Sequence, residues 1–223
     1  MRLDDWSERH LSPESPLIRM VGKYADLMVL NILWLLCSLP IFTIGASTTA
    51  LFQAVTAVRE DIGSPQRVFF KTFRMKFRKA TLAWLMVLVV GCWILYNILF
   101  ALTVQVAWKM PLIGVWVLLA FLYLVCVSYL FPVLAKHDLP IKKAMKAAFF
   151  AGMSKLEITL AVIVLNAIPA VMALFFPYYF LQLLLVWLLF GFSLIAFADA
   201  WLIQKVFFKI DPSDDPAKEE AFL

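Results

Sequence analysis

The stretch from Tyr24 to Arg59 constrains the fold more than any other part of the chain. Its first half, Leu27 to Leu39, is an almost unbroken run of apolar side chains, and a chain of 223 residues has no soluble core in which to place such a run. Pro40 then lacks a backbone N–H group and disfavours helix at Leu39. The stretch therefore predicts a membrane segment, either as one kinked crossing or as a tight helical hairpin.

The positions of the cations favour the hairpin. By the positive-inside rule, the loop from Arg59 to Thr81 is cytoplasmic, because it carries a dense set of cations. These are Arg59, Arg67, Lys71, Arg74, Lys76, Arg78 and Lys79, while Arg2, Arg9, Arg19 and Lys23 precede the stretch. A single crossing over residues 26–44 would leave the four earlier cations outside. A hairpin that starts near Leu17, turns around residues 40–45 and returns by Val58 keeps both flanks inside, so we expect the hairpin and retain the single crossing as the alternative.

The composition supports one integral membrane unit. Hydrophobic residues make up 64% of the chain and the mean hydropathy is +0.89, whereas soluble domains contain about 45–50% apolar residues. We expect a transmembrane domain over residues 17–203, between cytoplasmic tails at residues 1–16 and 204–223, in the plasma membrane. The net charge of +5 comes from cations that border apolar segments without a nucleic-acid motif, so we expect them to contact anionic lipid headgroups and not nucleic acid.

The rest of the chain predicts four spanning helices and two basic helices. The spanning helices are expected at residues 82–103, 112–134, 158–176 and 180–203. The basic helices are expected at residues 68–79 and 136–157, with apolar faces formed by Phe69, Phe70, Phe73 and Phe77 in the first and by Ile141, Met145, Phe149 and Leu156 in the second. The predicted fold class is thus all-α: a polytopic helical membrane protein with an N-terminal helical hairpin, four spanning helices and two basic cytoplasmic interfacial helices.

A few polar residues lie within the apolar segments and are candidates for function. They are Asp26, Asn31, Asn97, Asn166 and Asp199. Each must find a partner or a wet cavity, because hydrocarbon offers no hydrogen bonds. We expect the asparagines to bond between helices, and Asp26 or Asp199 to pair with a cation such as Arg19, Lys23 or Lys205, which would lock the hairpin against the last helix. A substrate or proton path is the alternative use of the two carboxylates.

The basic helices supply candidate residues for cytoplasmic docking or lipid binding. These are Lys71, Arg74 and Arg78 in the first helix and Lys142, Lys143 and Lys146 in the second. Two helix caps are also predicted, because short polar side chains there precede helical stretches. Asp138 is expected to cap the second basic helix, and the cluster Ser47 to Thr49 the returning helix of the hairpin.

Motifs that carry enzyme chemistry are missing from the sequence. It contains no phosphate-binding loop, zinc-binding helix, nucleophile elbow or dinucleotide fingerprint. Cys37, Cys92 and Cys126 each lie singly within an apolar run, which is typical of small buried side chains. We therefore expect no enzyme activity, no catalytic residue, no cofactor and no metal site.

Three segments resemble the YesL-like family of bacterial multi-pass membrane proteins, a family of unknown function. They are ADLMVLNILWLLCSLPIFTIGASTTAL (25–51), FFKTFRMKFRKAT (69–81) and FPVLAKHDLPIKKAMKAA (131–148). The resemblance implies a bacterial plasma-membrane protein of a kind often encoded beside carbohydrate ABC-transport components. It implies no catalytic residue.

Three functions are compatible with these observations. The first is an accessory or interaction subunit linked to carbohydrate uptake, whose basic helices contact the membrane subunits of an ABC transporter. The second is a small-molecule permease that acts on its own, which would need polar groups converging from several helices. The third is a membrane sensor or regulator, although the chain has no outer domain with which to sense.

Overall fold

The computed structural model describes residues 16–103 and 108–210, and this part of the chain is helical with no strand. The elements are α2 (Pro16–Ser38), the 3-10 helix η1 (Ile41–Thr43), α3 (Ile44–Arg59), α4 (Pro65–Thr103), α5 (Lys109–Lys136), α6 (Ile141–Ser154), α7 (Leu156–Phe175), α8 (Pro177–Gln182), α9 (Leu184–Val186), the π-helix η2 (Trp187–Gly191) and α10 (Phe192–Ile210). Most of both expected tails lie outside the described residues, as do residues 104–107 between the spanning helices expected at residues 82–103 and 112–134.

Six helical segments in the described ranges are long and apolar enough to cross a membrane. They are Ile18–Ser38, Ile41–Arg59, Pro65–Thr103, Lys109–Lys136, Leu156–Phe175 and Leu184–Val206. Spanning helices of this kind satisfy their own backbone hydrogen bonds, which the hydrocarbon interior demands. The predicted all-α, multi-pass membrane fold is confirmed.

A short break separates α2 from α3 at the predicted position. Pro40 follows the end of α2, and the Thr43 hydroxyl donates to Cys37 O and Pro40 O, both at 2.6 Å, which occupies carbonyls at the break. Across the break, Trp34 Nε1 donates to Thr48 Oγ1 at 3.2 Å, so α2 and α3 lie against each other.

The hydroxyls at the start of α3 do not cap it, and this prediction is wrong. Ser47 and Thr49 lie inside the helix and donate back to the carbonyls of Thr43 and Gly45. Thr43 occupies the N-cap position without a side-chain hydrogen bond. Back-bonding of this kind satisfies a buried hydroxyl without a partner from another helix.

Helix α4 is one continuous helix of 39 residues, about 58 Å long at 1.5 Å per residue. The sequence predicted a separate basic helix at residues 68–79 followed by a spanning helix at residues 82–103. Residues 66–90 contain neither Gly nor Pro, so nothing ends the helix between the two parts. The basic part is therefore an extension of the apolar part.

The basic part of α4 packs against α2 and α3. Gln66 Nε2 donates to Asp26 Oδ1 at 2.7 Å, and Trp84 Nε1 donates to Ile41 O at 2.8 Å. These two contacts place α2 and the following η1 alongside about the first five turns of α4. Phe69, which the sequence assigned to a lipid-facing side, is fully buried in the cluster that α2 and α3 form.

Helix α3 lies at the centre of the molecule. In its most apolar window 61% of residues are buried, against 6–33% for the other five candidate spans. Its small residues allow neighbouring helices to approach closely, as is common in membrane proteins. They include Gly45, Ala46, Ala50, Ala54 and Ala57. Helices α2, α4, α5 and α10 pack directly against α3.

Helix α6 packs on α5 through small residues and not through its large apolar ones. Ala144, Ala148, Ala151 and Gly152 are buried, and they contact the part of α5 that contains Val125 and Tyr129. Met145 and Leu156, which the sequence assigned to the apolar face, are exposed. The helix thus has an alanine face toward α5 and leaves larger apolar side chains on its surface.

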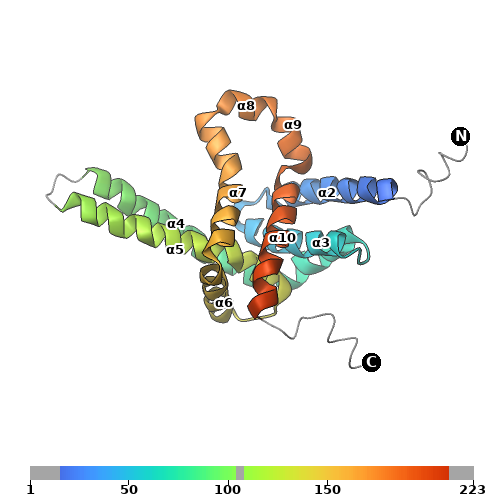
Figure 1. Ribbon diagram of the computed structural model, residues 1–223, viewed down its shortest axis with the longest axis horizontal. Coiled ribbons are helices and arrows are strands. Elements are labelled where there is room, and N and C mark those ends of the chain that lie inside the picture. The colour runs from blue at the N-terminus through green and yellow to red at the C-terminus, as the bar shows by residue number, and fades with distance from the viewer. Residues whose placement is uncertain (1–15, 104–107, 211–223) are drawn as a thin grey trace, which may run out of the picture.

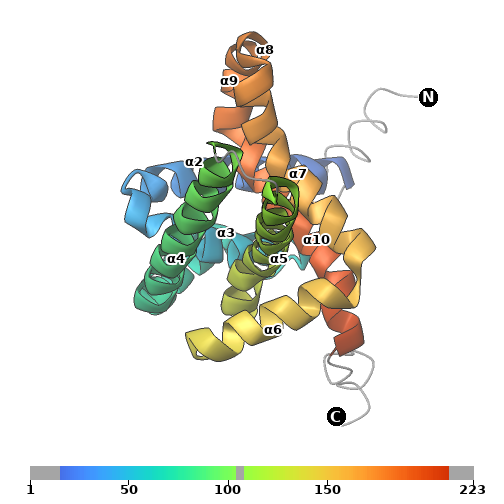
Figure 2. The same cartoon turned by 90° about the vertical axis from the view of Figure 1, so that its left-hand side faces the viewer.

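Two helical pairs project from this centre in different directions. Figure 1 shows α4 and α5 extending to the left, while α7 and α10 rise toward the uncharged bend that α8 and α9 form. In the view turned by 90°, α4 and α5 come toward the reader and the same bend remains at the top (Figure 2). The last crossing is not the single helix predicted at residues 180–203, because α8 ends at Gln182 and η2 interrupts the helix before α10.

The contact at Gly45 gives a direct test of the position of α3. A methyl group added there would lie 2.5 Å from both Ala80 O and Trp84 Cβ on α4. We expect Gly45→Ala to lower the free energy of unfolding by about 1–3 kcal/mol, because the two backbones must separate. Unfolding in mixed detergent micelles, followed by circular dichroism, measures the change.

Gly114→Ala is the matched control on α5, because an added methyl group there has nothing within 4 Å. It should leave the stability unchanged or raise it by up to about 1 kcal/mol through helix propensity. Equal effects of the two substitutions would contradict the close approach of α3 and α4.

Candidate functional site

Asn31 joins α2 to the π-helix before α10. Its Nδ2 donates to Trp187 O at 3.2 Å and to Leu188 O at 2.7 Å, and its Oδ1 accepts from Ser193 N at 2.9 Å. The side chain is completely buried. A π-helix disturbs the regular hydrogen-bond ladder of an α-helix, and Asn31 bonds backbone groups in and beside this interruption. The predicted interhelical role of Asn31 is confirmed.

Asn166 joins α7 to α10 through Asp199. Its Nδ2 donates to Asp199 Oδ2 at 2.6 Å and to Val162 O in its own helix at 2.9 Å. Asp199 is only 1% exposed, and its other oxygen, Oδ1, has no hydrogen-bond partner. Asn166 therefore acts between helices as predicted, while Asp199 keeps one unsatisfied acceptor.

The expected ion pair between the hairpin and the last helix does not form among the described residues, and this prediction is wrong. Lys23 Nζ pairs instead with Asp61 Oδ2 at 2.9 Å, and Asp26 accepts from Gln66. Lys205 Nζ lies 3.4 Å from the centre of the Trp201 ring, a cation–π contact. The link between α2 and the last helix is made by Asn31, which the sequence suggested only as a general interhelical contact.

Asn97 makes no interhelical hydrogen bond among the described residues, contrary to prediction. Its Nδ2 donates to Trp93 O in its own helix at 2.7 Å. One turn of helix satisfies the amide donor locally, so Asn97 does not join α4 to another helix in this structure.

A first cavity, of about 170 Å³, lies between α2, α3, α7 and α10 and includes Asp199 in its wall. Its other lining residues are Trp34, Thr48, Leu51, Phe52, Asn166, Pro169, Phe192, Ile195 and Ala196. No cation is among them. The sequence singled out Asp199 and Asn166, but it gave no reason to place them beside Trp34 and Thr48, which are more than a hundred residues away.

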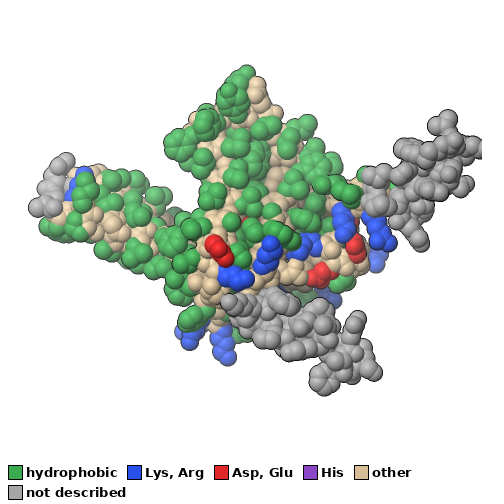
Figure 3. All heavy atoms as spheres, in the orientation of Figure 1, with side chains coloured by type: hydrophobic (Ala, Val, Ile, Leu, Met, Phe, Trp, Pro, Cys, Tyr) green, Lys and Arg blue, Asp and Glu red, His purple; other side chains and the backbone are tan. Residues whose placement is uncertain are grey.

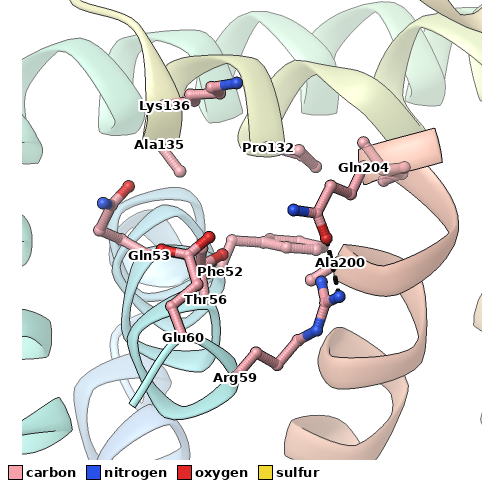
Figure 4. Close-up of a pocket in the computed structure, with 11 residues that line it drawn as sticks. Phe52, Gln53, Thr56, Arg59, Glu60, Pro132, Ala135, Lys136, Ala200 and Gln204 are labelled. Atoms are coloured by element: carbon pink, nitrogen blue, oxygen red, sulfur yellow. Dashed lines mark hydrogen bonds between the residues drawn. The ribbon is translucent and has the colours of Figure 1, made fainter. Parts of the chain in front are cut away.

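A second cavity, of about 220 Å³, lies between α3, α5 and α10, near the charged ends of these helices. Figure 4 shows the Arg59 side chain reaching from α3 toward Gln204 on α10, and Arg59 Nη2 donates to Gln204 Oε1 at 2.7 Å. Pro132 and Ala135 of α5 form the opposite wall. Phe52 lines both cavities, so they lie on two sides of the same helix. Sequence reasoning missed this cavity, because Arg59 was counted only as a loop cation.

The six docking candidates form what we call the basic surface. They are Lys71, Arg74 and Arg78 on α4 and Lys142, Lys143 and Lys146 on α6, and all six side chains are exposed. Figure 3 shows charged side chains gathered along the lower side of one face, while hydrophobic side chains cover the part formed by α7 to α9. This separation is the pattern that a bilayer boundary imposes.

Two lysines of α4 bond to the end of α5 and to the loop before α6, and so connect the two helices of the basic surface. Lys76 Nζ donates to the last carbonyls of α5, those of Leu134 and Ala135, where a cation is favourable. Lys79 Nζ pairs with Asp138 in the loop before α6, and this hydrogen bond lowers the pKa of the Asp138 carboxyl. Asp138 therefore bonds to α4 and does not cap α6, where Pro140 is the N-cap, so the predicted cap is wrong.

Within residues 16–103 and 108–210, no group of three His, Cys, Asp or Glu side chains is arranged to hold a metal ion. Cys37, Cys92 and Cys126 are free thiols. The chemistry available in the described part of the chain is thus that of a buried carboxylate, polar amides and surface cations.

Replacing Asn31 by Ala tests the link between α2 and the π-helix. The variant leaves two part-buried carbonyls and one buried N–H group without the Asn31 side chain, so we expect the free energy of unfolding to fall by about 1–3 kcal/mol. Asn97→Ala removes an amide that bonds only within its own helix, and we expect a change within about 0.5 kcal/mol. Detergent unfolding of both variants gives the comparison, and a larger loss for Asn97→Ala would refute the assignment.

Comparison with known proteins supports the resemblance. The family described as "Protein of unknown function, DUF624" matches residues 27–98, which include the break at Pro40 and much of α4. The "Uncharacterized protein YesL" of Bacillus subtilis (strain 168) is 28% identical over 142 residues, which are 60% of this chain. The match spans 65% of the length of that relative. No solved structure gives a significant match. The chain is therefore similar to the YesL-like proteins of unknown function over these residues.

Proposed function

We propose that the chain is an accessory subunit of a plasma-membrane complex linked to carbohydrate uptake. The basic surface carries this proposal. Its six cations are exposed on two helices that Lys79 and Asp138 join, and none of the six has an ion pair among the described residues. Unpaired cations beside apolar helices are suited to an acidic protein surface or to anionic lipid headgroups.

The proposed topology places the basic surface and both termini in the cytoplasm. The ion pair between Lys23, near the start of α2, and Asp61, just after α3, brings the two ends of this segment together. That contact supports a hairpin that enters and leaves on one side. The proposal takes α4 with α5, and α7 with α10 and its preceding turns, as four further crossings, which requires these two pairs to lie more nearly parallel in a bilayer than in Figure 1. Helix α6 then lies in the interface with its lysines toward the cytoplasm.

The proposed partner is a membrane subunit of a carbohydrate ABC transporter. The link to carbohydrate uptake depends on the YesL-like resemblance. The length of α4 and α5 supports a partner in the membrane, since this pair projects from the rest of the molecule (Figure 1) and only 17% and 6% of the residues in their most apolar windows are buried. Such a pair is free to pack against helices of another subunit.

A permease acting alone is the second candidate. The cavity beside Asp199 favours it, because a buried polar group within the membrane is common along substrate paths. Only Thr48, Asn166 and Asp199 supply polar side chains besides the Trp34 indole N–H, which is already bonded to Thr48. A continuous path for a sugar needs more groups than these.

Purification of the tagged full chain in mild detergent tests the proposal. We expect membrane subunits of an ABC transporter to co-purify in stoichiometric amount. The triple variants K71Q/R74Q/R78Q and K142Q/K143Q/K146Q should each reduce the co-purified amount at least about tenfold if the cations supply roughly 1.4 kcal/mol or more of binding free energy.

Arg19→Gln is the control, because Arg19 is an exposed cation on α2, outside both the basic surface and the projecting pair. It should leave co-purification unchanged. Carbohydrate flux into liposomes that contain this protein alone would instead establish the permease, and full co-purification by both triple variants would remove the basic surface from the interface.

A further inference from the structure

Arg59 has no anionic partner among the described residues. It is half-buried at the end of α3 and lines the cavity of about 220 Å³ between α3, α5 and α10. Its guanidinium forms no ion pair there, not even with Glu60, which lines the same cavity. A charge that has lost part of its hydration is stabilised by an anion in contact with it. The cavity is the space beside Arg59 in which such an anion can lie.

Two side chains of α10 fix the guanidinium at the wall of the cavity. Arg59 Nη2 donates to Gln204 Oε1 at 2.7 Å, and Arg59 Cζ lies 5.9 Å from the centre of the Phe197 ring. A guanidinium has further N–H donors in a planar fork, which matches the oxygens of a phosphate or a carboxylate. The fork is therefore held in place before a ligand binds, which lowers the cost of binding.

Gln204 adds a second donor group. Because its Oε1 accepts from Arg59, the orientation of the amide is fixed, and Figure 4 shows the amide nitrogen pointing away from Arg59 into the space between the helices. Donors thus approach this space from two directions. Oxygens of a tetrahedral phosphate point in several directions, whereas both oxygens of a carboxylate lie in one plane on one side of the group. The arrangement favours a phosphate.

The lining of the cavity is polar on one side and apolar on the other. Lys136 and Gln204 are exposed, while Phe52, Pro132 and Ile203 are buried. The entrance is therefore polar, and Lys136 places a second cation there. An apolar part of a ligand can lie against the buried side chains, as is common in binding sites for small molecules.

We infer that this cavity binds the phosphate group of a phosphate ester. The phosphate oxygens accept hydrogen bonds from the Arg59 guanidinium and from Gln204 Nε2, and the rest of the ester contacts Phe52 and Pro132. The Glu60 carboxylate opposes binding, but it is exposed and water screens its charge. The site is separate from the basic surface, so the inference does not depend on the proposed accessory role.

Isothermal titration calorimetry of the purified full chain in dodecyl maltoside tests the inference. We expect saturable binding of dihexanoyl phosphatidylglycerol at one site. Dihexanoylglycerol has the same acyl chains but no phosphate, and it should bind at least about tenfold more weakly, because it offers no anion to Arg59. Equal affinities for these two probes would overturn the site. So would the absence of saturable binding both by the phosphatidylglycerol and by sn-glycerol 3-phosphate.

Two charge variants locate the binding in the chain. Arg59→Gln should weaken binding of dihexanoyl phosphatidylglycerol at least about tenfold. Glu60→Gln removes a repulsive charge and should strengthen binding about two- to fivefold, an effect that a purely structural role of these residues would not produce. Arg67→Gln is the control, because Arg67 is an exposed cation on α4 that does not line the cavity, and it should leave binding unchanged.

Gln204→Glu keeps the test decisive if Arg59→Gln fails to fold. The new carboxylate still accepts from Arg59 and pairs with it, so the protein itself supplies the anion. We expect binding of dihexanoyl phosphatidylglycerol to fall at least about tenfold without a loss of thermal stability. Unchanged binding by Gln204→Glu, or by a folded Arg59→Gln variant, would overturn the assignment.

The phosphate can belong to a lipid headgroup or to a soluble phosphate ester. Displacement of dihexanoyl phosphatidylglycerol by sn-glycerol 3-phosphate at a similar concentration would support a soluble ligand at this site. Saturable binding of the phosphatidylglycerol that sn-glycerol 3-phosphate does not displace would support a lipid headgroup, whose acyl chains contact the apolar side of the cavity.

Discussion

The close packing of α3 among its neighbours is the constraint on which the rest of the structure depends. Apolar burial gives little drive for helices to associate within a membrane, since lipid tails are equally apolar. Close approach of small residues is then what holds helices together. Gly45 contacts the backbone of α4, and Phe52 separates the two cavities. Both candidate sites therefore depend on the position of this one helix.

Hydrogen bonds of buried polar side chains also join the helices. Asn31 satisfies three backbone groups around the π-helix, and Tyr129 on α5 bonds to Thr159 on α7 at 3.0 Å. Each of these buried groups has its partner inside the protein. Three buried side-chain atoms of the described residues have no such partner, namely Ser38 Oγ, Thr81 Oγ1 and Asp199 Oδ1.

The sequence predicted the features that composition and helix breakers determine. Long apolar runs located the candidate spans, and Pro40 located the break between α2 and α3. The interhelical roles of Asn31 and Asn166 followed from the cost of a polar group in hydrocarbon. These inferences needed only local sequence, so they did not depend on knowing which helices are neighbours.

The features that depend on neighbours could not be predicted in this way. The periodicity of the sequence placed Phe69 on an apolar face of its helix. It did not show that Phe69 packs against α2 and α3 and not against lipid. In α6 the alanine face is the buried one, because small residues permit closer contact with α5 than Met145 does. The cavity beside Asp199 combines Trp34 with Phe192, and no local pattern connects two residues so distant along the chain.

Lipid-phase photolabelling tests the central position of α3 most directly. A membrane-dissolved diazirine reacts with side chains that contact lipid, and mass spectrometry of the peptides reports the labelling of each helix without any substitution. We predict sparse labelling of Ile44–Arg59 and heavy labelling of the apolar parts of α4 and α5, which are mostly exposed in the structure. Labelling of α3 at the level of α5 would contradict the account.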